Sequence, residues 1–126
     1  MQDVLPPLAE GIHRLDAYDA EGFVISGTRH EGAVLVCASH VIPASEFAIA
    51  HLSEASFEAV FALSPPPEIL LVGTGAQHVF IPPKWRSYTK QRGAVLESMD
   101  TGAACRTYNV LLGEGRLVCA ALLPIS

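Results

Sequence analysis

The chain has 126 residues, of which 50% are hydrophobic and 17% are charged, and its formal net charge at pH 7 is -5. This length suits one domain, and the charged share lies below the roughly 25% of an average soluble domain. We therefore expect a single domain over residues 1–126, with an apolar surface that favours a protein partner. The eight basic residues are scattered among thirteen acidic ones, which argues against nucleic-acid binding.

The cysteines and histidines form neither a disulfide framework nor a metal-ligand pattern. Cys37, Cys105 and Cys119 are odd in number and include no C-x-x-C pair, which is typical of reduced thiols in a cytosol. His40 follows Cys37 by three residues, but this stretch has the pattern of a strand and a turn. We expect no metal and no cofactor.

The chain also shows no targeting or membrane signal. Its first residues lack the basic start and the apolar run of a signal peptide. The longest apolar run, 117–125, is well short of the roughly 20 residues that cross a bilayer as a helix. We therefore expect a soluble, cytoplasmic protein without a transmembrane segment.

The N-terminal half has the pattern of antiparallel strands. Residues 1–11 contain two adjacent prolines and predict an irregular arm. Alternating or β-branched runs are then separated by polar turns, and runs and turns follow one another as 12–18, 19–22, 23–26, 27–32 and 33–37. This order predicts a hairpin, a second polar turn and a third strand, which together form an N-terminal antiparallel unit.

The second half alternates between helices and strands. Ser53 is a good N-cap for a helix over 54–63, and three consecutive prolines after Ser64 end that helix. The segments that follow are a strand at 68–72, a helix at 84–91 opened by Pro82-Pro83 and closed by Gly93, a strand at 94–98, a helix from residue 100 and a strand at 116–123. This alternation predicts parallel strands joined by right-handed crossovers.

A glycine-rich turn, Gly73-Thr74-Gly75, follows the continuously apolar run at 68–72, which is typical of a strand covered on both faces. Such a turn can direct backbone N–H groups at an anion. The dinucleotide-binding fingerprint is incomplete, because His78 stands where a third glycine is due. Two interpretations stay open: a tight turn that needs small residues, or one wall of a ligand crevice at the strand ends.

The start of the helix predicted from residue 100 supplies the second wall of that crevice. Asp100 or Thr101 is a plausible N-cap, and Gly102 leaves the first turn bare enough for a close backbone approach. If the strands before the two segments are neighbours, both segments face one crevice. The candidate ligand-binding residues are Gly73, Thr74, Gly75, Asp100, Thr101, Cys105, Arg106, Tyr108 and Asn109.

Three side chains in the second half have alternative interpretations. The helix dipole and Arg106 predict a lowered pKa for the Cys105 thiol, yet no histidine follows as a base, and a lone helical cysteine is usually a small buried residue. We therefore assign no catalytic residue. Arg106 either binds an anion or pairs with Asp100. Trp85 is either an exposed interface anchor or half-buried beside Tyr88.

Two segments of the chain, Ile69–Gly75 (ILLVGTG) and Met99–Arg116 (MDTGAACRTYNVLLGEGR), resemble the Mth938-like, DUF498-type family of small proteins. The resemblance extends from about Ile12 to Pro124. It implies an α/β (α+β) fold of layered β+β/α type, in which the antiparallel N-terminal unit packs on a mixed sheet with helices on the other side. The family includes a mitochondrial assembly factor of respiratory complex I, and it brings no established catalytic set.

Two functional hypotheses follow. The first is a non-enzymatic interaction protein or assembly factor with a protein partner, which the resemblance links to respiratory complex assembly. The second is a binding protein for a small molecule or anion, or an enzyme, with a pocket between Gly73–Gly75 and Asp100–Arg106. The weakly charged composition and the lack of a nucleophile–base pair favour the first hypothesis.

Overall fold

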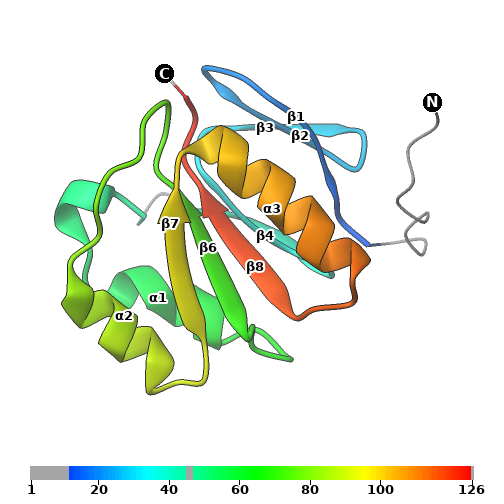
Figure 1. Ribbon diagram of the computed structural model, residues 1–126. Coiled ribbons are helices and arrows are strands. Elements are labelled where there is room, and N and C mark those ends of the chain that lie inside the picture. Colours follow the sequence, from blue (N-terminus) through cyan, green and yellow to red (C-terminus); the bar gives the residue numbers. More distant parts are fainter. Residues whose placement is uncertain (1–11, 45–46, 126) are drawn as a thin grey trace.

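Two β-sheets and three α-helices make up the computed structural model over the residues it describes, 12–44 and 47–125 (Figure 1). The small sheet has the strand order β1 (Leu15–Tyr18), β2 (Gly22–Ile25) and β3 (Thr28–Glu31). The large sheet has the order β5 (His40–Pro43), β4 (Val34–Cys37), β8 (Val118–Leu122), β6 (Ile69–Gly73) and β7 (Val95–Met99). The predicted arm over 1–11 lies outside the described residues.

The small sheet confirms the first hairpin and corrects the turn after it. Strands β1 and β2 pair antiparallel, with Leu15 opposite Ile25. The prediction of a turn over 27–32 is wrong, because Thr28–Glu31 form β3 and pair with β2. The turn is only Ser26-Gly27, whose positive φ angles of 49° and 83° suit a tight two-residue hairpin. Strand β3 is polar because it is an exposed edge, so no apolar alternation marks it.

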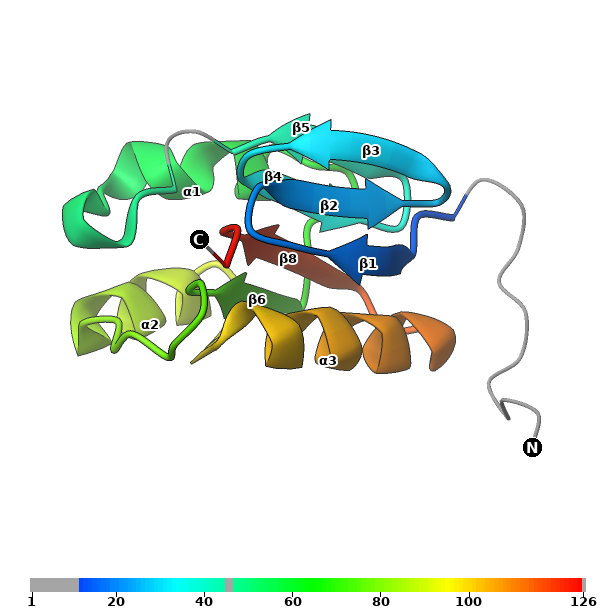
Figure 2. The same ribbon diagram turned by 90° about the horizontal axis from the view of Figure 1, so that it is seen from above.

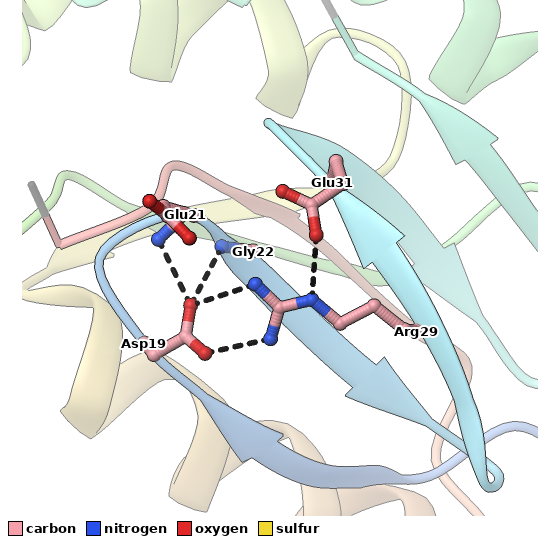
Figure 3. Close-up of polar contacts among 5 residues, drawn as sticks. All are labelled: Asp19, Glu21, Gly22, Arg29 and Glu31. Carbon is pink, nitrogen blue, oxygen red and sulfur yellow. Dashed lines mark hydrogen bonds and ion pairs between the residues drawn. The ribbon is translucent and has the colours of Figure 1, made fainter.

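An ion-pair network fixes the β1–β2 turn against β3 (Figure 3). Asp19 Oδ1 accepts hydrogen bonds from the backbone N–H groups of Glu21 and Gly22, at 2.9 and 3.0 Å. The Arg29 guanidinium donates to both Asp19 oxygens and, through Nε, to Glu31. The hydrogen bonds from Arg29 and from the turn hold the pKa of Asp19 well below its usual range. This network therefore holds the end of β1 in place.

The large sheet confirms the predicted parallel pairing and moves one predicted strand. Strand β6 pairs parallel with both β7 and β8. Residues 33–37 were expected in the N-terminal unit, but β4 lies between β5 and β8 in the large sheet. All four β4 residues are buried, which requires cover on both faces. Strand β5 was not predicted, because three of its residues are only half-buried, Pro43 is exposed, and the turn before it lacks glycine.

The helices begin and end close to their predicted positions. They are α1 (Glu54–Phe61), α2 (Pro83–Lys90) and α3 (Thr101–Gly113), and a short 3₁₀ turn covers Ile49–His51. At α1 the N-cap Ser53 donates its backbone N–H to Ser56 Oγ at 3.1 Å. At α3 the Asp100 side chain accepts from the backbone N–H of Ala103 at 2.9 Å. Ser53 is therefore the N-cap of α1 as predicted, and of the two candidates for α3 the N-cap is Asp100, with Thr101 as the first helical residue.

Two apolar clusters place the helices on opposite faces of the large sheet. Phe57 of α1 and Trp85 of α2 pack with one cluster, and Tyr108 of α3 packs with the other, which includes Phe23 of the small sheet. The layered α/β class is thus confirmed (Figure 2). The resemblance implied helices on the face opposite the N-terminal unit, which holds for α1 and α2. Helix α3 instead lies on the same face as the small sheet, because Tyr108 belongs to one apolar cluster with Phe23. Trp85 is buried, with its ring 5.2 Å from that of Phe57, so the half-buried interpretation was the better one.

Candidate functional site

The glycine turn and the start of α3 meet as the sequence predicted. Strands β6 and β7 are parallel neighbours, and Gly73 lies opposite Met99 in their register. The backbone N–H of Thr101 donates to the Gly75 carbonyl at 2.9 Å, and the Gly75 N–H donates to Thr101 Oγ1 at 2.9 Å. The two segments are therefore fastened directly to each other at the carboxyl ends of the strands.

The turn uses its polar groups for its own structure. Thr74 Oγ1 donates to the Gln77 carbonyl at 2.7 Å and accepts from the Val79 N–H at 3.0 Å. A Cβ atom on Gly73 would lie 3.0 Å from Thr101 Cα, and Gly75 has a φ of 106°. Small residues are required at both positions for these reasons. The tight-turn interpretation accounts for this segment, and its Gly75 N–H group is already occupied.

Two adjoining open hollows lie in front of this junction. One, of about 200 Å³, is lined by Tyr18, Gly75, Ala76, Asp100, Gly102, Arg106 and Ile125. The other, of about 300 Å³, is lined by Leu15, Asp16, Ala17, Tyr18, Cys105, Arg106 and Asn109. We call these linings together the Tyr18–Arg106 surface, because both residues belong to each hollow. It includes five of the nine candidate residues and excludes Gly73, Thr74, Thr101 and Tyr108.

Arg106 is the free charge of this surface. Its side chain is exposed, and it makes no ion pair or hydrogen bond within residues 12–44 and 47–125. The alternative that it pairs with Asp100 is therefore not realised there. The Asp100 carboxylate caps α3 instead, through the bond from the Ala103 N–H. Arg106 remains available to an anionic group of a partner.

Cys105 does not have the lowered pKa that its position in the helix suggested. Its side chain is only 5% exposed and packs in the cluster between α3 and the small sheet. Burial raises the pKa of the Cys105 thiol to about 12, although the charge of Arg106 acts in the opposite direction. Loss of solvation outweighs the nearby charge because the thiolate would sit among apolar side chains. The sequence-based prediction was wrong on this point.

Tyr108 and Asn109 connect α3 to the segment around β1. The Tyr108 hydroxyl donates to the His13 carbonyl at 2.8 Å. The Asn109 amide makes two hydrogen bonds with the backbone of Leu15. Burial raises the pKa of Tyr108, so its hydroxyl stays protonated as a donor. Both side chains thus have structural partners within the fold.

Sequence reasoning missed Tyr18, which forms the other side of this surface. Its side chain is 38% exposed, and a Cβ atom on Gly102 would lie 2.5 Å from its hydroxyl oxygen. Tyr18 comes from the small sheet, so no local pattern links it to α3. The glycine at position 102, noted as a bare first turn, was the one available signal that another group approaches closely.

Other possible functional features are limited among the described residues. No group of three or more His, Cys, Asp or Glu side chains within 12–44 and 47–125 is placed to hold a metal ion. The helices in this part of the chain are all too short or too polar to span a membrane. Exposed apolar side chains do occur, and Phe80, in the segment between β6 and α2, is 67% exposed.

Related proteins are similar in sequence to this chain over most of its length. The family model described as "Protein of unknown function (DUF498/DUF598)" matches residues 15–123. NADH dehydrogenase (ubiquinone) 1 alpha subcomplex assembly factor 3 from Bos taurus is 36% identical over 110 residues, which are 87% of this chain and 60% of that protein. An uncharacterized protein from Rhodobacter capsulatus is 36% identical over 111 residues, 88% of this chain and 84% of its own length. The chain therefore spans about 60% of the assembly factor.

Solved structures agree with this relationship. A protein from Bordetella parapertussis superposes with a TM-score of 0.82 at 31% identity, over 93% of this chain and 99% of that one. A Mth938-like domain from Bordetella pertussis has a TM-score of 0.71 at 26% identity, over 99% of this chain and 94% of that one. From its sequence and its fold, the chain belongs to the Mth938-like DUF498 family.

Proposed function

We propose that this chain is a protein-binding factor that supports the assembly of an NADH dehydrogenase complex. The observation that carries the proposal is the 36% identity to the bovine assembly factor, which extends over 87% of this chain. The family model matches residues 15–123, a range that includes both sheets and all three helices, so the relationship covers the fold and not one motif. A role in binding is consistent with the low charge content of the chain.

The Tyr18–Arg106 surface is the contact surface in this proposal. Arginine and tyrosine are enriched among the residues that carry binding energy in protein interfaces. Arg106 projects from a long helix whose start is fastened to the glycine turn, so its backbone position is fixed before a partner binds, and its exposed side chain is free to meet a partner group. We expect the partner to present a carboxylate to Arg106 and an apolar side chain to Tyr18.

The shape of this surface favours a protein partner over a small ligand. Small-molecule pockets enclose most of the ligand surface. Here both hollows are open to solvent, and the Gly75 N–H that would bind an anion is used by Thr101. The second hypothesis from the sequence, a ligand pocket or enzyme at this position, therefore gains no support.

Deletion and complementation in a cell that encodes both the chain and an NADH dehydrogenase complex test the proposal. Deletion should lower the amount of assembled complex on a native gel, and the wild-type gene should restore it. We expect Arg106→Glu to restore it poorly, whereas Lys90→Glu, an exposed charge reversal at the end of α2, should restore it fully.

The possible outcomes test the assembly role and the Tyr18–Arg106 surface independently. An unchanged level of complex after deletion contradicts the assembly role. If deletion lowers the level of complex and Arg106→Glu restores it as well as the wild-type gene does, the assembly role stands. The Tyr18–Arg106 surface is then rejected as the contact surface. Both variants should first show the wild-type melting temperature.

A further inference from the structure

Two cysteines and a histidine line up across three strands of the large sheet, on the face covered by α1 and α2. Cys37 of β4 lies opposite Cys119 of β8 and opposite His40 of β5 in the strand registers. Residues directly opposite each other on antiparallel strands point to the same face, with Cβ atoms about 4.5–5.5 Å apart. Both cysteines belong to the same apolar cluster. The three side chains therefore form one row across the sheet, which we call the thiol row.

The two thiols of this row have different surroundings. His40 Nδ1 lies 3.6 Å from Cys37 Sγ and 3.0 Å from Ser39 Oγ. The hydrogen bond from the Cys119 thiol, together with His40 and nearby backbone N–H groups, lowers the pKa of Cys37 against the effect of its burial. The same hydrogen bond between the two thiols, together with burial, raises the pKa of Cys119. Cys37 is thus the nucleophilic member of the pair, and Cys119 keeps its proton.

Both cysteines of the thiol row line one small cavity. It measures about 60 Å³, and its lining includes Cys37, Cys119, Arg116, Pro65 and Pro67. A cavity needs roughly 10–15 Å³ of such volume to hold one water molecule, so this one can hold a molecule the size of hydrogen peroxide. Arg116 brings a positive charge to the same cavity, where it favours negative charge on a departing oxygen.

We propose that Cys37 and Cys119 form a dithiol that hydrogen peroxide oxidises to a cross-strand disulfide. His40 first takes the proton of the Cys37 thiol. The thiolate then attacks one peroxide oxygen, so that an S–O bond forms, the O–O bond breaks, and the departing hydroxide takes the proton from His40 to become water. Cys37 is now a sulfenic acid.

The second step closes the disulfide. Cys119 Sγ attacks Cys37 Sγ, the S–S bond forms, and the S–O bond breaks. The departing hydroxide takes the Cys119 thiol proton and leaves as water. In sum, two thiols lose two electrons and two protons, and one peroxide becomes two water molecules. This chemistry is independent of the Tyr18–Arg106 surface and of the proposed assembly role.

Cys105 provides an internal comparison for this site. It is a free cysteine like the other two, but it lies in the other apolar cluster, and its pKa is raised. Among the described residues, no thiol or histidine acts on it. Oxidation that depended on thiol content alone would affect all three cysteines. Oxidation by the mechanism above is confined to the thiol row.

The test is oxidation of the full chain, reduced beforehand, with one equivalent of hydrogen peroxide near neutral pH, followed by peptide mapping without reduction. We expect a Cys37–Cys119 disulfide, two thiols lost per chain, and Cys105 unmodified. The rate should exceed that of reduced glutathione at the same pH at least tenfold. A rate no greater than that of glutathione, or oxidation of Cys105 as fast as that of Cys37, overturns the proposal. This comparison uses only the wild-type chain.

Variants then assign the roles of the individual residues. Cys119→Ala should leave a sulfenic acid on Cys37 that dimedone captures, and Cys37→Ala should abolish the fast reaction. His40→Phe should slow the oxidation about tenfold without changing the melting temperature by more than a few degrees. A dimedone adduct on Cys119 in place of Cys37 would contradict the assignment of the nucleophile. Unchanged oxidation in His40→Phe would contradict the role of the histidine.

Discussion

The side-chain amide of Asn109 forms a pair of hydrogen bonds with the backbone of Leu15, much as a neighbouring strand would. Its Oδ1 accepts from the Leu15 N–H at 3.0 Å, and its Nδ2 donates to the Leu15 carbonyl at 2.7 Å. Leu15 opens β1, which has β2 as its only partner strand among the described residues. Asn109 therefore occupies the free edge of the small sheet and fixes it to α3.

Replacement of Asn109 by leucine should destabilise the fold by about 2–4 kcal/mol, because two partly buried backbone groups of Leu15 lose their partners. Chemical denaturation monitored by circular dichroism measures this change. Val110→Ala, at an exposed position on the same helix, is the matched control and should change the free energy of unfolding by less than about 0.5 kcal/mol. Equal effects of the two substitutions would reject the role of the amide.

Thr101→Val should lower the free energy of unfolding by about 2–4 kcal/mol. The Thr101 side chain is fully buried, and its hydroxyl accepts from the Gly75 N–H and donates to the Leu123 carbonyl at 2.6 Å. Valine has nearly the same shape and leaves both backbone groups unpaired. Thr101→Ser, which keeps the hydroxyl, should lose less than half as much stability. The account fails if serine is as disruptive as valine.

Gly102→Ala should move the Tyr18 side chain, because the added Cβ would lie 2.5 Å from the Tyr18 hydroxyl oxygen. In the wild-type background, we expect a change in unfolding free energy within about 1 kcal/mol, since the partly exposed tyrosine can rotate away. In a Tyr18→Ala background, alanine should stabilise the helix by up to about 1 kcal/mol. A double-mutant cycle measures the coupling, and strict additivity would contradict the close contact.

Cys105 should react with iodoacetamide at pH 8 about a thousand times more slowly than a free thiol with a pKa near 8.5. A pKa of about 12 leaves only a small thiolate fraction at that pH, and burial limits access further. Mass spectrometry of the Cys105 peptide over time provides the rate. Labelling as fast as that of glutathione would show that the thiol is exposed.

The Asp19–Arg29 pair should make stability depend on acid pH. The pKa of Asp19 is lowered in the folded chain, so the unfolded state binds its proton first as the pH falls. The contribution of the Asp19–Arg29 pair to the free energy of unfolding is therefore complete at neutral pH and is lost progressively below about pH 4. Asp19→Asn should lower the melting temperature by a few degrees at most at pH 7, because the pair is exposed, and this difference should shrink near pH 2.5.

The control for this prediction is Glu21→Gln, which removes one negative charge from the same turn without breaking the Arg29 pair. Its effect on the melting temperature should be close to zero at both pH values. If both variants lower the melting temperature equally, the effect comes from net charge and not from the ion pair.

Elements that local patterns determine were predictable from the sequence. The continuous apolar run before Gly73 indicated the buried strand β6, and Ser53 and Asp100 marked the starts of two helices. Strands β3 and β5 were not predicted, because one is an exposed edge and the other is only half-buried. The position of β4 was also missed, since pairing with β8 depends on a segment far along the chain.

The sequence predicted only the part of the candidate site that lies at the ends of neighbouring strands. The neighbouring strands β6 and β7 bring Gly75 and Asp100 together, and Arg106 follows nearly two helical turns after Asp100. The burial of Cys105 and the approach of Tyr18 both result from the packing of the small sheet on α3. No local sequence pattern specifies that packing, so the pKa of Cys105 was predicted in the wrong direction.

The most direct test of the central claim is photo-crosslinking of the full chain in its own cell. A photoreactive phenylalanine analogue replaces Tyr18, and the control carries it at Lys90 on the end of α2. We predict that position 18 crosslinks to a subunit or assembly intermediate of the NADH dehydrogenase complex, whereas position 90 does not. Crosslinks from position 18 that contain no component of that complex, or identical crosslinks from both positions, would contradict the proposed function and its surface.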